Sequence, residues 1–180
     1  QLVADDYAIQ ERMALDAVIT QGGSERCYTA INDVVVTGGT VSRLLDLDIW
    51  CGEEQVINYR ADGVIVSTPT GSTAYSLSAG GPVVEPVAQT MVVCPICTHN
   101  MRFSSYVLSP EHTLTIELER NGRKPVYLFV DESRAFSLKA DDKIQVRRSK
   151  HTVRLVRLSE RSFCEIFAQK MLPGGFEDEK

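Results

Sequence analysis

Turn residues divide most of this 180-residue chain into short segments, and this spacing is the sequence feature that most restricts its fold. Gln21-Gly-Gly-Ser24, Gly38-Gly39 and Gly52-Glu53 separate segments that alternate polar and apolar residues or are rich in β-branched residues. Turn signals about every 8–12 residues are typical of an antiparallel β-sandwich, whereas a parallel α/β sheet needs a helix between strands. We therefore predict a mainly β, β-sandwich-like domain with two short helices.

Period-two alternation and β-branched residues indicate most of the strands. They are expected over residues 7–20, 27–36, 44–51, 55–60, 64–66, 91–93, 113–119, 125–130, 143–148 and 152–158. Asn121-Gly122 predicts a hairpin turn between the strands at 113–119 and 125–130, and residues 149–151 are expected to join the last two strands. Helices are predicted over residues 71–79 and 162–171, the second capped by Ser162. One domain is expected over residues 1–172, followed by a mobile polar tail at 173–180.

Composition excludes several classes of protein. The net charge of −5 argues against a general nucleic-acid binder, and no apolar run approaches the ~20 residues of a membrane span. The first residues lack the basic and apolar regions of a signal peptide, and five irregularly spaced cysteines predict reduced thiols in the cytoplasm. Seven basic residues lie within residues 143–161. They are interpreted as the solvated side of two strands, with a polyanion-binding face as the less favoured reading.

Residues 61–75 carry the most chemical information. A short apolar strand leads into Ser67-Thr-Pro-Thr-Gly-Ser-Thr73, a loop rich in hydroxyl groups, which is predicted to open a helix. Backbone N–H groups at a helix start suit a phosphate or ribose oxygen, and Tyr75 offers a face on which a base could stack. The glycine at position 71 is expected to let the backbone approach a ligand closely. Taken alone, the pattern leaves open that Thr70 or Ser72 caps a helix and that Tyr75 belongs to the core.

Several segments, in the same order, resemble the NAD kinase family. The strongest match runs from Asp62-Gly63 through Ser-Thr-Pro-Thr-Gly-Ser-Thr-Ala-Tyr75 to Ser78-Ala-Gly-Gly-Pro82. Ala30-Ile-Asn-Asp33 resembles the family's Asn-Glu motif, Pro95-Ile-Cys-Thr-His99 its Pro-Ile-Cys-Pro-His segment, and Val130-Asp131 its Val-Asp-Gly strand. The segment from Ser137 to Ile144 also resembles the family.

This resemblance implies transfer of the γ-phosphate of ATP, or of polyphosphate, to the 2′-hydroxyl of the adenosine ribose of NAD, which gives NADP. The implied NAD-binding residues are Asn32 and Asp33 at the ribose, Thr73, Ala74, Tyr75 and Ser78 at the adenine and ribose, and Asp62 at the nicotinamide end. Asp62 is expected to serve mainly the dinucleotide of a neighbouring subunit in a homodimer or homotetramer. Gly63, Thr70, Gly71 and Ser72 are expected to shape the loop, and Mg²⁺ to arrive with ATP rather than in a protein cage.

The chain also departs from the family pattern. Asp33 replaces the usual Glu, Thr98 a usual Pro, and Glu132-Ser133 the usual Gly-Gln. The family's Gly-Gly-Asp-Gly-Thr motif, which belongs to an N-terminal α/β domain and supplies the expected catalytic Asp, does not occur in this sequence. The chain therefore resembles the C-terminal, NAD-binding domain, which is expected to be inactive alone.

Other interpretations remain open at this stage. A non-catalytic nucleotide sensor or a lipid kinase of the same superfamily would share the fold, although a lipid kinase has no evident use for the hydroxyl-rich loop. Cys94-Pro-Ile-Cys97 with nearby histidines suggests zinc, but a structural site needs a second ligand pair at tight spacing. No metal ligand is predicted.

Overall fold

The computed structural model describes residues 7–39, 44–98, 104–118, 125–132, 134–139 and 142–171. Two compact units divide the chain: residues 12–153 form one, and residues 1–11 with 154–180 form the other. The strands are β1 Ala8–Gln21, β2 Ser24–Ala30, β3 Asp33–Gly38, β4 Leu45–Cys51, β5 Glu54–Ala61, β6 Gly63–Ser67, β7 Met91–Ile96, β8 Tyr106–Leu108, β9 Thr113–Leu118, β10 Val126–Val130, β11 Arg134–Leu138 and β12 Lys143–Arg157. The helical segments are η2 Gly71–Thr73, α1 Tyr75–Ser78 and α2 Phe163–Met171.

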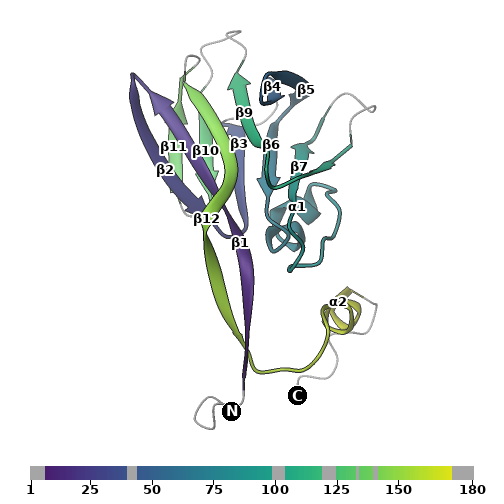
Figure 1. Cartoon of the computed structure of the whole chain (residues 1–180). Coiled ribbons are helices and arrows are strands. Elements are labelled where there is room, and N and C mark those ends of the chain that lie inside the picture. Colours follow the sequence, from purple (N-terminus) through teal and green to yellow (C-terminus); the bar gives the residue numbers. More distant parts are fainter. Residues whose placement is uncertain are drawn as a thin grey trace. The chain divides into compact units, whose positions relative to one another are not determined.

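Two six-stranded sheets form the larger unit (Figure 1). The first sheet has the order β2-β1-β12-β9-β4-β5, and the second has the order β11-β10-β3-β6-β7-β8. Their inner faces share one core, which includes Leu15 of β1, Ile49 of β4, Val36 of β3 and Leu128 of β10. The predicted mainly β architecture with short helices is therefore confirmed.

Strand β3 shows how one segment serves both the core and a second surface. Val34 and Val36 lie in the core between the sheets, whereas Val35 lies in a smaller apolar cluster with Ile65, Cys94 and Ile96 on the opposite face. Alternation then places Asp33 and Thr37 on the same face as Val35. Short segment α1 lies beside β6 and β7 on this side of the second sheet (Figure 1). The candidate site forms on this outer face.

Two predicted strand pairings are wrong. β9 pairs with β12 and β4 in the first sheet, whereas β10 pairs with β11 and β3 in the second, so they do not form the hairpin expected around Asn121-Gly122. That turn itself lies outside the described residues. The two basic strands expected at 143–148 and 152–158 are one continuous strand, β12, without a turn at 149–151. Each strand has partners from distant parts of the chain, and local alternation cannot specify these.

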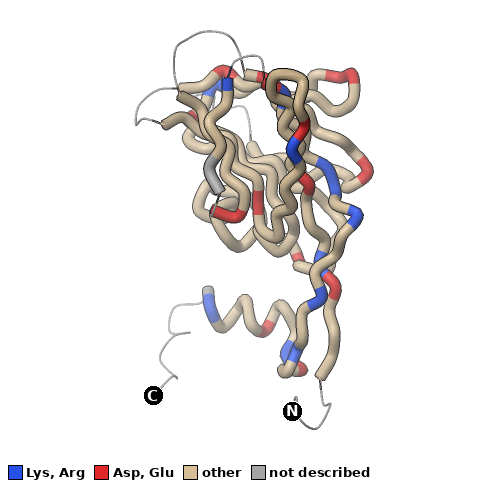
Figure 2. Tube along the Cα trace, turned by 90° about the vertical axis from the view of Figure 1, so that its left-hand side faces the viewer, with Lys and Arg blue, Asp and Glu red and all other residues tan. Residues whose placement is uncertain are grey.

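The strand predicted over residues 27–36 is also divided. It breaks at residues 31–32 into β2 of the first sheet and β3 of the second, so the chain crosses between sheets at Ile31 and Asn32. The basic residues of β12 are spread along the strand (Figure 2), and those at 143, 147, 148, 150 and 154 have exposed side chains. Exposure agrees with the solvated-strand interpretation and leaves polyanion binding untested.

Helix α2 belongs to the smaller unit and begins as predicted. The Ser162 Oγ accepts a hydrogen bond from the Glu165 backbone N–H at 3.2 Å, and the Glu165 carboxylate accepts one from the Ser162 N–H at 2.6 Å. This reciprocal pair is a capping box. Phe163 and Phe167 lie on one side of the helix with ring centroids 5.7 Å apart. The predicted mobile tail, residues 173–180, lies outside the described residues, and the domain boundary at 172 stays a prediction.

Candidate functional site

The carboxylate of Asp131 holds the turn at residues 31–32. It accepts hydrogen bonds from the backbone N–H groups of Ile31 at 2.7 Å, Asn32 at 2.7 Å and Asp33 at 3.1 Å. The Asp131 N–H in turn donates to the Asp33 carbonyl at 3.1 Å. Hydrogen bonds to an ionised carboxylate are stronger than those between neutral groups. The crossover between the sheets is therefore fixed by a residue about one hundred positions further along the chain.

The hydroxyl-rich loop holds the same turn from the other side. The Thr68 N–H donates to the Asn32 carbonyl at 2.9 Å, and the Thr68 hydroxyl donates to the Ile31 carbonyl at 2.6 Å. The same hydroxyl accepts the Gly71 N–H at 3.0 Å. A Cβ at position 71 would lie 2.0 Å from the Asn32 carbonyl oxygen. Gly71 is therefore needed for packing against this turn, and its expected close approach to a ligand stays a prediction.

Asp33 is a buried carboxylate that lacks a hydrogen-bond partner within the described residues. The side chain is 1% exposed, and both Oδ atoms are unpaired there. Its register partner across β3 and β6 is Ser67, whose hydroxyl is also buried and unpaired in the described part of the chain. Burial, and then the charges of Asp131 and Glu132, raises the pKa of Asp33 to about 6. An unpaired buried carboxylate is unfavourable, so a ligand hydroxyl that donates to it would stabilise the ionised form.

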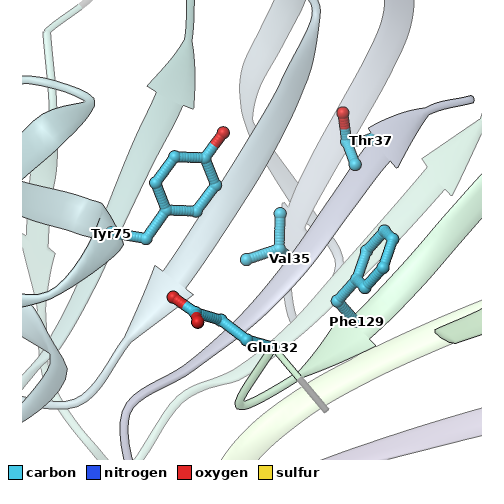
Figure 3. A pocket seen from close by; sticks show the side chains of 5 residues that line it. All are labelled: Val35, Thr37, Tyr75, Phe129 and Glu132. Atoms are coloured by element: carbon cyan, nitrogen blue, oxygen red, sulfur yellow. The ribbon is translucent and has the colours of Figure 1, made fainter. Parts of the chain in front are cut away.

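A hollow of about 360 Å³ lies on the outer face of the second sheet. It is lined by Val35 and Thr37 of β3, Phe129 of β10, Tyr75 of α1 and Glu132. In Figure 3 the Tyr75 ring stands on one side, Val35 and Phe129 form an apolar surface, and the Glu132 carboxylate points toward Tyr75. The size and the mixture of apolar surface with a few polar groups are those of a small-molecule site.

Tyr75 lines this hollow and is also influenced electrostatically by two of the predicted carboxylates. The ring is 38% exposed, so it is available to a ligand and is not a core residue. Burial raises the pKa of the Tyr75 phenol, and among the charges that raise it further are those of Asp33 and Asp62. The phenol is therefore a neutral hydrogen-bond donor near neutral pH, close enough to both carboxylates to be influenced by them.

Asp62 lies between β5 and β6, where its backbone is well anchored. Its N–H donates to the Ile96 carbonyl at 2.9 Å, and its carbonyl accepts the Gly38 N–H at 3.2 Å and the Thr37 hydroxyl at 3.0 Å. The half-buried side chain has no such partner among the described residues. The next residue, Gly63, packs closely, since an added Cβ would lie 2.4 Å from the Val36 carbonyl oxygen.

The remaining predicted residues lie along the loop and α1. Thr73 and Ser78 are exposed, and Ala74 is half-buried between η2 and α1. The Thr73 hydroxyl donates to the Thr70 carbonyl at 3.3 Å. These residues are close to Tyr75 in the sequence, but they are not among the residues that line the hollow.

The predicted helix at 71–79 is shorter than expected. It consists of a three-residue 3₁₀ turn and one turn of α-helix, and the Thr70 side chain makes no capping hydrogen bond. The Ser72 hydroxyl is buried and donates to the Pro69 carbonyl at 2.7 Å while accepting the Val84 N–H at 3.0 Å, so it ties the loop together and does not cap the helix. So short a helix has little macrodipole, which weakens the helix-end argument, and phosphate binding at this loop stays a prediction.

The sequence missed most of the hollow. Val35, Thr37, Phe129 and Glu132 were not predicted as site residues, although Glu132 was noted as a departure from the family pattern. Alternation beginning at Asp33 would have placed Asp33, Val35 and Thr37 on one face. Because one unbroken strand was predicted over residues 27–36, the alternation that begins at Asp33 was not recognised.

The cysteines, the metal-ligating side chains and the search for membrane-spanning helices add no residue to the candidate site. Cys94 is buried in β7, and burial raises the pKa of its thiol, which opposes a reactive thiolate. Cys97 is exposed, and His99 lies outside the described residues. Within the ranges that the structure describes, no group of three or more His, Cys, Asp or Glu side chains could hold a metal ion. In the same ranges no helix has the length and apolar character needed to span a membrane.

Comparison with known proteins identifies the family. The model of the ATP-NAD kinase C-terminal domain matches residues 31–158, which includes the turn, the loop and the hollow. The chain belongs to this family. It is 39% identical over 176 residues to the NAD kinase of Lachnoclostridium phytofermentans, covering 94% of the chain and 62% of that protein. The NAD kinase of Symbiobacterium thermophilum is 42% identical over 172 residues, covering 95% of the chain and 60% of that protein.

A solved structure also resembles this ATP-NAD kinase domain. Yeast NADH kinase complexed with NADH has a TM-score of 0.84 and 26% sequence identity, covering 99% of this chain and 54% of that one. The chain thus spans about 60% of the length of the curated relatives it matches. The predicted family is confirmed, and the part that matches is the C-terminal domain.

Proposed function

We propose that this chain is the dinucleotide-binding part of an NAD kinase. The reaction transfers the γ-phosphate of ATP, or of polyphosphate, to the 2′-hydroxyl of the adenosine ribose of NAD and gives NADP. The observation that supports this most directly is the unpaired Asp33 carboxylate beside the fixed 31–32 turn, which interacts electrostatically with Glu132 and Tyr75 of the hollow. A carboxylate with free acceptor oxygens suits the hydroxyl groups of a ribose.

Each predicted residue has a proposed role in this arrangement. Asn32 and Asp33 bind ribose hydroxyls. Tyr75 stacks on a base, with Thr73, Ala74 and Ser78 along the same edge. Asp62 binds the nicotinamide end of a dinucleotide that belongs mainly to a neighbouring subunit of a homodimer or homotetramer. These residues bind and orient the dinucleotide, while the aspartate that activates the 2′-hydroxyl belongs to the Gly-Gly-Asp-Gly-Thr motif, which this sequence lacks.

Mg²⁺ is proposed to arrive with the triphosphate. Mg²⁺ in nucleotide sites is bound largely by substrate phosphates and water, and the described residues hold no group of three or more ligands for a metal ion. The described residues are proposed to bind and orient the dinucleotide. Alone, this chain is proposed to bind NAD without phosphorylating it.

The test measures NAD binding by calorimetry and NADP formation, using the product of the complete reading frame that encodes this chain. Tyr75→Ala should raise the Kd for NAD by about tenfold, because stacking on a base contributes roughly 1–3 kcal/mol, and Tyr75→Phe should raise it less. Tyr7→Ala is the matched control, since Tyr7 is 40% exposed and Tyr75 38%. Failure of the unaltered protein to bind NAD would overturn the proposal, and binding without NADP formation would indicate a nucleotide sensor.

A further inference from the structure

Glu132 is the charged side chain of the hollow. The other four lining residues are Val35, Thr37, Tyr75 and Phe129, of which only Thr37 and Tyr75 carry polar groups. The Thr37 hydroxyl already donates its proton to the Asp62 carbonyl. The hollow therefore presents a carboxylate and a hydroxyl lone pair as acceptors, and the Tyr75 phenol as its donor.

The backbone at Glu132 is strained, and nothing in the described part of the chain explains why a side chain stands there. Its φ of +56° lies in the left-handed region, which is unfavourable for a residue other than glycine. Asp131, with φ +47°, adopts the same conformation, but its carboxylate makes three hydrogen bonds to the 31–33 backbone. The Glu132 side chain makes no hydrogen bond or ion pair with the residues that the structure describes, and it points across the hollow toward Tyr75 (Figure 3).

Among the described residues, the charged groups that act on the side chains of the hollow are negative. The charges of Asp131 and Glu132 raise the pKa of Asp33. The charges of Asp33 and Asp62 raise the pKa of the Tyr75 phenol. None of the five lining residues is basic. This surrounding disfavours a phosphate or carboxylate in the hollow and favours a flat, uncharged or positively charged ring. Val35 and Phe129 supply an apolar surface for such a ring, and the Tyr75 ring supplies a face for stacking.

We propose that Glu132 is a specificity-determining residue that accepts a hydrogen bond from the amino or amide N–H edge of a heterocycle bound in this hollow. The inference rests on the proposed function, and it adds the chemical group that the hollow selects. Two parts of NAD carry this chemistry: the amino group of adenine and the carboxamide of nicotinamide. Replacing either N–H₂ with an oxygen would place an acceptor or an anion against the carboxylate, and this is strongly unfavourable.

The experiment compares three dinucleotides by calorimetry on the product of the complete reading frame. Deamino-NAD carries hypoxanthine in place of adenine, and deamido-NAD carries a carboxylate in place of the carboxamide. The unaltered protein should bind one of these analogues at least about tenfold more weakly than NAD, as expected when a hydrogen bond to a charged group is lost. The analogue that is rejected identifies which end of NAD meets Glu132.

Glu132→Gln tests the residue itself. The Gln amide can turn its NH₂ group toward an acceptor, so the Kd ratio of the rejected analogue to NAD should fall by about tenfold or more, while the ratio for the other analogue stays constant. Glu54→Gln is the matched control, because Glu54 is an exposed carboxylate on β5 in the other sheet, and it should leave both ratios unchanged.

The outcomes separate the two proposals. If the unaltered protein binds NAD but Glu132→Gln changes neither ratio by more than twofold, the role of Glu132 is refuted and the proposed function stands. If the unaltered protein binds none of the three dinucleotides, both are refuted. A ratio that falls equally in Glu132→Gln and Glu54→Gln would also refute the role, because it would reflect the general charge of the protein.

Discussion

Three tight hairpin turns within the described residues can be compared by the residues that adopt the left-handed backbone conformation. Gly22 and Gly23 join β1 to β2, and Gly52 joins β4 to β5, all with positive φ and with nothing within 4 Å of an added Cβ. The turn from β10 to β11 uses Asp131 and Glu132 at φ +47° and +56°. Glycine therefore occupies this conformation in the first two turns, where the chain only reverses. Side chains occupy the strained conformation where the turn also fixes the 31–33 backbone and lines the hollow.

The largest expected effect is that of Asp131→Ala. Three backbone N–H groups lose their acceptor, so the free energy of unfolding should fall by about 3 kcal/mol. Gly22→Ala, in a turn without such contacts, should cost about 1 kcal/mol through its backbone conformation alone. Urea denaturation measures both. Equal losses in the two variants would mean that the carboxylate does not hold the turn.

Gly71→Ala should lower the free energy of unfolding by about 2 kcal/mol, because its Cβ would overlap the Asn32 carbonyl and force the turn to move. The Kd for NAD should rise in the same variant. Gly80→Ala is the control, since its φ of +87° imposes strain in open space, and it should cost about 1 kcal/mol without changing NAD affinity. A Gly71→Ala protein with unaltered stability would contradict the packing role assigned to this glycine.

The raised pKa of Asp33 predicts how the free energy of unfolding depends on pH. Its pKa is about 6 in the folded chain against 3.8 ordinarily, so the folded state binds this proton more tightly than the unfolded state. The free energy of unfolding should therefore fall as pH rises from about 4 to about 6.5, by on the order of 2 kcal/mol.

Asp33→Asn removes this titration and should flatten the pH dependence, measured by denaturation at a series of pH values. Asp46→Asn is the control on the other sheet, where the Asp46 carboxylate lies 3.7 Å from Arg60. It should leave the dependence unchanged. If Asp33→Asn gives the same slope as the unaltered chain, the carboxylate is not ionising in a buried position.

The smallest expected effect is a gain. Glu132→Gly should raise the free energy of unfolding by about 0.5–1 kcal/mol, because glycine adopts the left-handed conformation without strain. Gly52→Glu places the same side chain in a turn with no ligand role and should lower stability by a similar amount. Thermal denaturation should show a higher Tm for Glu132→Gly and a lower Tm for Gly52→Glu than for the unaltered protein. Destabilisation by Glu132→Gly would mean that its side chain supports the fold, which would remove the comparison between the turns.

The sequence by itself determined the class of fold, most strands and the family. Alternation with period two reports which face of a strand is buried, and glycine turns such as Gly22-Gly23 and Gly52 report where the chain reverses, since both are local properties. The capping box of α2 is likewise local, because Ser162 and Glu165 are one helical turn apart. The hydroxyl-rich loop and the Asn32-Asp33 segment were therefore visible as site candidates before the fold was known.

Only the tertiary structure decided which strands pair and what forms the hollow. Alternation in β9 and β10 shows that each has a buried face but does not show that they lie in different sheets. The break at 31–32 is fixed by Asp131, and Glu132 then meets Tyr75, which lies 57 positions earlier in the chain. Such contacts depend on the packing of distant segments, and the local pattern of residues carries no information about the partner across the core.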